Sequence, residues 1–175
     1  IHRVQQIIDV AKARGRKVAV VGRSLENLVS VGSALGYLDV PENILIPIDT
    51  IRNYPDDRLV IITTGSQGEP MSALYRMAFS EHRKVDIGPN DYVIISATPI
   101  PGNEKMVGKV VDELLKQGAE VVYERMYEVH VSGHACQEEL KIMMSLTKPK
   151  YFIPVHGEQK HLRKHASLAS SMGIE

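Results

Sequence analysis

The sequence predicts an α/β fold with a mainly parallel, Rossmann-like sheet and helices on both faces. Short and almost continuous apolar runs at 17–21, 59–63 and 92–96 are typical of strands that are buried on both faces. Apolar stripes with a helical period lie between these runs, and the clearest one covers 106–115. The connections are short, and strands that alternate with helices favour βαβ units with parallel pairing.

The composition describes an ordinary globular chain. It has 175 residues, of which 43% are hydrophobic and 24% charged, enough for one sizeable core. Lys+Arg and Asp+Glu are both 21, whereas a dedicated nucleic-acid module is usually strongly basic. The balance argues against tight non-specific RNA binding and leaves room for a local positive site. The single cysteine, Cys136, excludes an intrachain disulfide and indicates a reducing compartment, and no apolar run is as long as a membrane span.

The first third of the chain predicts a helix, a strand and a second helix. Apolar residues from Val4 to Ala11 follow i, i+3, i+4, i+7 spacing. The strand 17–21 then leads to a turn in which Ser24 is a candidate N-cap. A second helix follows and closes at Gly36, and residues 44–46 form a candidate short strand.

The rest of the chain repeats the alternation. In chain order we expect a strand at 59–63, a helix at 71–80, a strand at 92–96, a helix that begins after Asn103 and stops at Gly118, a strand at 120–123, a helix at 137–147, a strand at 151–155 and a helix at 158–172. Pro154 removes a ladder donor, so the strand at 151–155 belongs at an edge or at the end of pairing.

Three loops share one design, an apolar strand followed by a Gly/Ser-rich loop and a helix. They are 22–24, 64–69 and 97–103. Helix N-termini favour phosphate, and the carboxyl ends of parallel strands meet at one edge of a sheet, so we expect the loops to gather there. Many such loops bind nothing. None matches G-x-G-x-x-G or the P-loop, so a nucleotide cofactor is weakly supported.

Two histidines, His134 and His156, each stand where an expected strand gives way to a loop, and each is flanked by a glycine. His134 closes the stretch 130–134, which offers two imidazoles, a hydroxyl and a glycine N–H for phosphate oxygens. His156 precedes Gly157, and imidazole is a common zinc ligand, although one histidine cannot hold zinc and no partner ligand stands at suitable spacing. The structural alternative is that both are hydrogen-bonded loop histidines.

His161 and His165 form a further i, i+4 pair on the last expected helix. The pair lacks the glutamate of H-E-x-x-H and its neighbours are basic. We interpret it as a solvated helix face.

Four motifs together resemble a known family. The stretches 130–134 and 154–158, with Thr64-Gly-Ser-Gln-Gly-Glu-Pro70 and Thr98-Pro-Ile-Pro-Gly-Asn103, are similar to those of the ribonuclease J family, in the β-CASP branch of the metallo-β-lactamase nucleases. The likeness covers nearly the whole chain, and the motifs follow the family's order.

The resemblance implies a division of the chain and a role for each histidine. Residues 1–128 would be a β-CASP domain. Residues 129–175 would carry the family's motif B, matched by His134, and motif C, matched by His156, back into a metallo-β-lactamase domain. The His-x-His-x-Asp-His metal motif is absent, which implies a fragment. His134 would assist the chemistry and His156 would complete a two-metal zinc site. The residues that would bind substrate are His130, Val131, Ser132, Gly133 and His134.

The function that the resemblance implies is RNA hydrolysis. The full-length parent would be a zinc-dependent 5′-to-3′ exonuclease and endonuclease that uses a metal-activated water, and this chain would supply substrate recognition while being inactive alone. The parent would be a cytoplasmic homo-oligomer that prefers RNA with a 5′ monophosphate and has no membrane partner. The alternatives are a non-enzymatic phosphate- or nucleotide-binding domain of doubly wound type, and a protein-interaction module.

Overall fold

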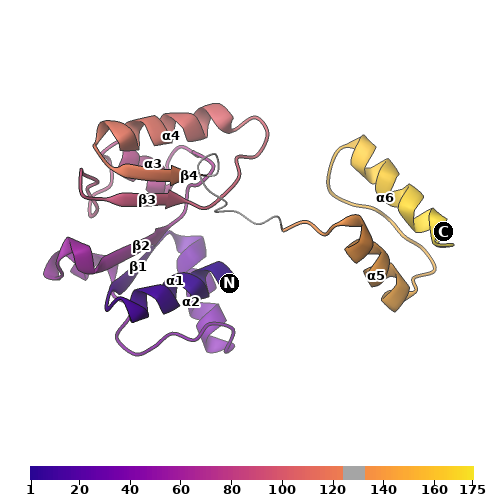
Figure 1. Ribbon diagram of the computed structural model, residues 1–175, viewed down its shortest axis with the longest axis horizontal. Coiled ribbons are helices and arrows are strands. Elements are labelled where there is room, and N and C mark those ends of the chain that lie inside the picture. The colour runs from indigo at the N-terminus through magenta and orange to yellow at the C-terminus, as the bar shows by residue number, and fades with distance from the viewer. Residues whose placement is uncertain (124–132) are drawn as a thin grey trace. The chain divides into compact units, whose positions relative to one another are not determined.

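Residues 1–123 and 133–175 are described in the computed structural model of the chain. They belong to two units, Ile1–His130 and Val131–Glu175 (Figure 1). The elements of the first unit are α1 (His2–Ala13), β1 (Lys17–Val21), α2 (Arg23–Ala34), the 3-10 turns η1 (Ile48–Asn53) and η2 (Asp56–Arg58), β2 (Leu59–Thr63), α3 (Ala73–Ala78), β3 (Tyr92–Ile95), α4 (Glu104–Lys116) and β4 (Glu120–Tyr123). The second unit contains α5 (Gln137–Thr147) and α6 (Gln159–Ser171).

The described strands pair in parallel as two two-stranded sheets. β1 pairs with β2 from Lys17↔Leu59 to Val21↔Thr63, and β3 pairs with β4 from Tyr92↔Glu120 onward. Parallel pairing requires a crossover between the strands, and the helices supply it. The predicted α/β class is confirmed.

Alternate residues of β1 enter two different cores, as the period of two requires. Val18 and Val20 pack with α1 and α2, together with Val60 and Ile62 of β2. The neighbouring residues pack on the other face, against η1 and α3; they are Ala19 and Val21 of β1 and Leu59 and Ile61 of β2. The pair β1–β2 is therefore covered on both faces, as the continuous apolar runs predict.

The short helix α3 joins the two sheets, because two of its faces are apolar. Ala73 and Met77 belong to the core beside β1. Leu74 and Ala78 belong to the core that α4 forms with β3 and β4. Most of the α4 stripe is buried in that core as expected, and Leu114 is completely buried, whereas Leu115 at its end is 50% exposed. Figure 1 shows α4 beside the β3–β4 pair.

Several sequence-based boundaries differ from the structure. α2 begins at Arg23 with Gly22 as its N-cap, so the assignment of Ser24 as the cap is wrong. Gly22 has a φ of 121°, a conformation that glycine tolerates best, and this sets the start of the helix. The expected strand at 44–46 is reduced to an isolated bridge between Val18 and Leu45. The helix expected at 71–80 is shorter, because Met71 has a φ of 72° and Ser72 caps the helix instead.

In the second unit, both helices lie where the sequence predicts them, but the strand expected at 151–155 is absent from the described residues. The backbone there makes a single exchange with the last residue: Phe152 N–H donates to the Glu175 carbonyl oxygen at 2.8 Å, and Glu175 N–H donates to that of Lys150 at 3.2 Å. Pro154 has no N–H with which to extend this pairing. In the described part of the chain, no helix is long and apolar enough to cross a membrane.

Candidate active site

The three Gly/Ser-rich loops of the first unit lie together, as expected. Gly22 packs so closely on the next loop that a Cβ there would lie 2.7 Å from Thr64 Oγ1. Gln67 ties that loop to the third one: its Nε2 donates to the Thr98 carbonyl oxygen at 3.0 Å, and its Oε1 accepts from Ile100 N–H at 2.8 Å. The side chain of Asn103, the N-cap of α4, also reaches Gln67 Oε1, at 3.4 Å. One edge of this unit therefore carries three loops that hydrogen bonds and close packing hold together.

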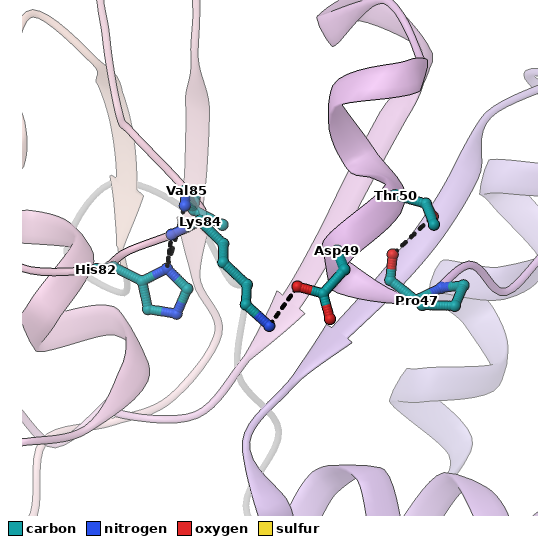
Figure 2. Close-up of polar contacts among 6 residues, drawn as sticks. All are labelled: Pro47, Asp49, Thr50, His82, Lys84 and Val85. Atoms are coloured by element: carbon teal, nitrogen blue, oxygen red, sulfur yellow. Dashed lines mark hydrogen bonds and ion pairs between the residues drawn. The ribbon is translucent and has the colours of Figure 1, made fainter.

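A second feature of the first unit is a basic hollow beside the turn that follows α3. The hollow measures about 160 Å³, and Lys84 Nζ lies 2.6 Å from Asp49 Oδ1 at its edge (Figure 2). His82 shapes the turn, because its Nδ1 accepts from the N–H groups of Lys84 and Val85 at 3.4 and 3.1 Å. Burial, and then the positive charges of Arg76 and Lys84, lower the pKa of His82, while Asp86 opposes the shift.

The second unit brings His134 and His156 together. Their imidazole rings are almost parallel, 5° apart, with centroids separated by 5.7 Å. His134 precedes α5 and His156 precedes α6, so two segments that are 22 residues apart in sequence (156 − 134) supply the pair. Both side chains are exposed to solvent. The structure thus places the two candidate site residues side by side, while the role of each stays a prediction.

The two rings line a pocket of about 530 Å³ between the beginnings of α5 and α6. Its polar lining includes three side chains of α6, namely His161, Lys164 and His165. Leu140 of α5 and Leu168 of α6 supply apolar lining. Four imidazoles and one ammonium group in one pocket suit an anionic ligand that accepts hydrogen bonds.

The helix α6 contributes more to the pocket than the sequence indicated. His161 Nδ1 accepts from Glu158 N–H at 3.1 Å, and His161 N–H donates to the Glu158 carbonyl oxygen at 2.9 Å. His165 is half-buried, its ring meets Phe152 edge-on at 4.7 Å, and its buried Nε2 has no partner among the described residues. The interpretation as a solvated face is therefore wrong for His165. The signal that could have indicated His161 is its position three residues after the N-cap Glu158, where capping-box side chains stand.

The remaining residues expected to bind substrate are only partly described. Gly133 is exposed, and among the described residues no atom beyond its chain neighbours lies within 4 Å of the position that its Cβ would take, so there is room for a ligand beside it. His130, Val131 and Ser132 lie outside the described residues. Their role in binding stays a prediction.

Among residues 1–123 and 133–175, no three His, Cys, Asp or Glu side chains come together as a metal site. A catalytic zinc needs three protein ligands. His134 and His156 are only two such side chains, and no third one among the described residues joins them. The described residues therefore do not make a complete zinc site.

Comparison with known proteins identifies the family. Residues 1–114 match the family described as "Ribonuclease J, beta-CASP domain", and residues 118–175 match the "Zn-dependent metallo-hydrolase RNA specificity domain". The chain belongs to the ribonuclease J family. The matches do not favour a doubly wound nucleotide-binding domain or an interaction module.

Individual relatives of the ribonuclease J family agree with this assignment. The chain is 51% identical over 99% of its length to "Ribonuclease J" of Helicobacter pylori and 47% identical over 99% to that of Synechocystis. It is 43% identical over its whole length to "Ribonuclease J2" of Bacillus subtilis. The chain spans only 25% of the Helicobacter protein and 31% of the Bacillus protein. The second family description implies metal use, and the predicted boundary between 128 and 129 stays a prediction.

Proposed function

We propose that this chain forms the RNA-recognising part of a ribonuclease J-type phosphodiesterase, together with one side of its active site. The observation that carries the proposal is the pocket in which His134 and His156 stack at 5.7 Å, beside His161, Lys164 and His165. RNA phosphates are anionic hydrogen-bond acceptors, and this pocket presents imidazole and ammonium groups.

In this proposal the two histidines have different partners. His134 contacts the phosphate that is cut and donates a hydrogen bond or a proton to its oxygens, and its neighbours in sequence, Ser132 and Gly133, supply further donors. His156 is one ligand of a zinc in a two-metal site, whose other ligands lie outside these 175 residues. The family description "Zn-dependent metallo-hydrolase" supports a metal.

The substrate and setting follow from the same proposal. The substrate is RNA with a 5′ monophosphate, cut from the 5′ end and internally. The longer protein is a homo-oligomer. The single cysteine, Cys136, supports the cytoplasm as its compartment.

The test compares this chain with a longer protein that contains it. Each is incubated with 5′-monophosphorylated and 5′-triphosphorylated RNA in the presence of zinc or manganese. We expect the longer protein to cut, with a preference for the monophosphate, and the 175-residue chain to bind RNA without cutting it. Cleavage by the chain alone that disappears in His134→Ala would show that the chain has a complete site.

A further inference from the structure

The turn that carries His156 has an unfavourable backbone conformation. His156 has a φ of 72° and Gly157 a φ of 110°. A residue other than glycine in this region is strained, and such a conformation persists only where the surroundings hold it. Contacts with neighbouring residues must therefore stabilise the turn 156–158.

The side chain of His161 meets this requirement. Its Nδ1 accepts the N–H of Glu158 at 3.1 Å, two residues after the strained His156. The ring also lies against the backbone of Gly157, where an added Cβ would be 3.1 Å from the His161 Cβ and 3.2 Å from its Nδ1. The first turn of α6 fixes His161 in place, because its own N–H donates to the Glu158 carbonyl oxygen at 2.9 Å. The imidazole thus contacts the turn at both Gly157 and Glu158.

The same turn decides where the ring of His156 lies. It holds that ring 5.7 Å from His134 and almost parallel to it, and the ring of His161 lines the same pocket. A change of φ at His156 out of the left-handed region would rotate its Cα–Cβ bond and separate the two rings.

We propose that His161 is a positioning residue that holds His156 opposite His134 by fixing the backbone of the turn 156–158. The effect of His161 on RNA cleavage rests on the proposed function. Its effect on the position of His156 does not, because that concerns only the second unit of this chain.

The experiment uses a matched pair of substitutions in the 175-residue chain. His161→Gln keeps an acceptor, since glutamine at this helix position returns a hydrogen bond to the N-cap N–H, whereas His161→Met has a similar shape without a comparable acceptor. Lys164→Met is the control, because Lys164 lines the pocket from the same helix but makes no described contact with the turn.

The readout is the nuclear magnetic resonance spectrum of the two rings. In the unchanged chain, His161→Gln and Lys164→Met, we expect Overhauser contacts between His134 and His156 and a Glu158 amide that exchanges slowly. In His161→Met both signatures should be lost, while the amide shifts of 162–171 still report a helix. Ring contacts that persist in His161→Met would overturn the proposal, as would their loss in Lys164→Met.

A measurement on the unchanged chain covers the case in which His161→Met fails to fold. The nitrogen shift of His161 Nδ1 should be that of an unprotonated acceptor, with the ring proton on Nε2. A proton on Nδ1 would overturn the proposal.

Activity of the longer protein separates this proposal from the proposed function. His161→Met should lower kcat by about 10- to 100-fold with little change in KM, because a small misplacement of a catalytic group has that effect, and His161→Gln should restore most of it. If the rings separate in His161→Met and RNA cleavage is unchanged, the positioning role stands and the role of the pocket in catalysis is wrong.

Discussion

At the scale of single residues, the protonation state of His82 decides whether its ring can hold the turn that follows α3. Only an unprotonated Nδ1 can accept the N–H groups of Lys84 and Val85 (Figure 2). Burial and the nearby cations lower its pKa from the ordinary value of 6.5, so the unfolded chain takes up the proton first as the pH falls. The stability that His82 contributes is therefore complete above pH 6.5 and is lost as the pH falls through 6.5 towards the folded-state pKa.

The prediction concerns His82→Asn, which keeps an acceptor but does not titrate. We expect the urea midpoint of the unchanged chain to fall more steeply between pH 7.5 and 5 than that of the variant, because only the unchanged chain loses the contribution of His82. Parallel pH profiles for the two proteins would show that His82 does not hold the turn through its neutral form.

A second prediction separates the two central histidines in a longer protein that contains this chain. His156→Ala should lower metal content and RNA cleavage together. His134→Ala should leave metal content unchanged and lower turnover by on the order of 10²–10⁴, as expected when a positioned proton-transfer or charge-stabilising group is lost. Metal analysis and cleavage rates of the two purified variants measure this. Equal metal loss in both would show that the roles are not separate.

The sequence predicted His134 and His156 because local features, the flanking glycines and the neighbouring polar groups, mark them. It did not predict the contribution of α6. The ring of His161 acts on a backbone turn whose positive φ values appear only in the folded chain. His165 is half-buried because Phe152 folds against it, a contact across 13 residues (165 − 152) that no spacing rule indicates.

At the scale of elements, the clearest test lies where the loop 64–69 meets α4. A Cβ at Gly68 would lie 2.6 Å from the carbonyl carbon of Met106, and Gly68 has a φ of 72°. Neither the backbone of α4 nor this φ can adjust cheaply. We expect Gly68→Ala to lower the free energy of unfolding by roughly 1–3 kcal/mol from backbone strain alone, with the clash adding to it.

Gly108 within α4 is the matched control. Apart from the backbone of α4 and the two chain neighbours, no atom of the described residues lies within 4 Å of the position that its Cβ would take. Gly108→Ala should raise the free energy of unfolding by about 0.5–1 kcal/mol, because alanine is the better helix former. Urea denaturation of both variants measures the pair. A neutral Gly68→Ala would mean that the loop does not pack on α4 as described.

A helix or strand was predicted correctly where the element that it packs on or pairs with is present nearby. The stripe of α4 was predicted correctly except for the exposed Leu115, because its buried side chains pack on the neighbouring β3–β4 pair. The run 151–155 was predicted wrongly, since a strand needs a neighbour as well as an apolar sequence. Its alternate residues Tyr151, Ile153 and Val155 are exposed at 63%, 81% and 77%, in a segment with strand-like alternation and no described strand beside it.

At the scale of the whole molecule, composition correctly predicted an ordinary globular chain. It could not predict how charges are distributed over the fold or how the chain divides into units. Equal numbers of acidic and basic residues are distributed unevenly, so that Arg52, Arg83 and Lys84 meet in one hollow while the chain stays neutral. The division into two units also follows from contacts rather than composition. Few residues of the second unit are buried, with Met144 and Ala169 the described examples, so its small core depends on a few contacts.

The last prediction concerns the metal content of the 175-residue chain. Zinc that survives dialysis requires at least three converging ligands, and the described residues present no group of three His, Cys, Asp or Glu side chains. The rings of His134 and His156 lie with their centroids 5.7 Å apart, but no third ligand among the described residues joins them. Elemental analysis after incubation with zinc and dialysis should therefore find well below one zinc per chain, with His161→Ala and His165→Ala indistinguishable from the unchanged protein. One zinc per chain that is lost in either variant would mean that α6 supplies metal ligands, and would replace the capping role of His161 with a coordinating one.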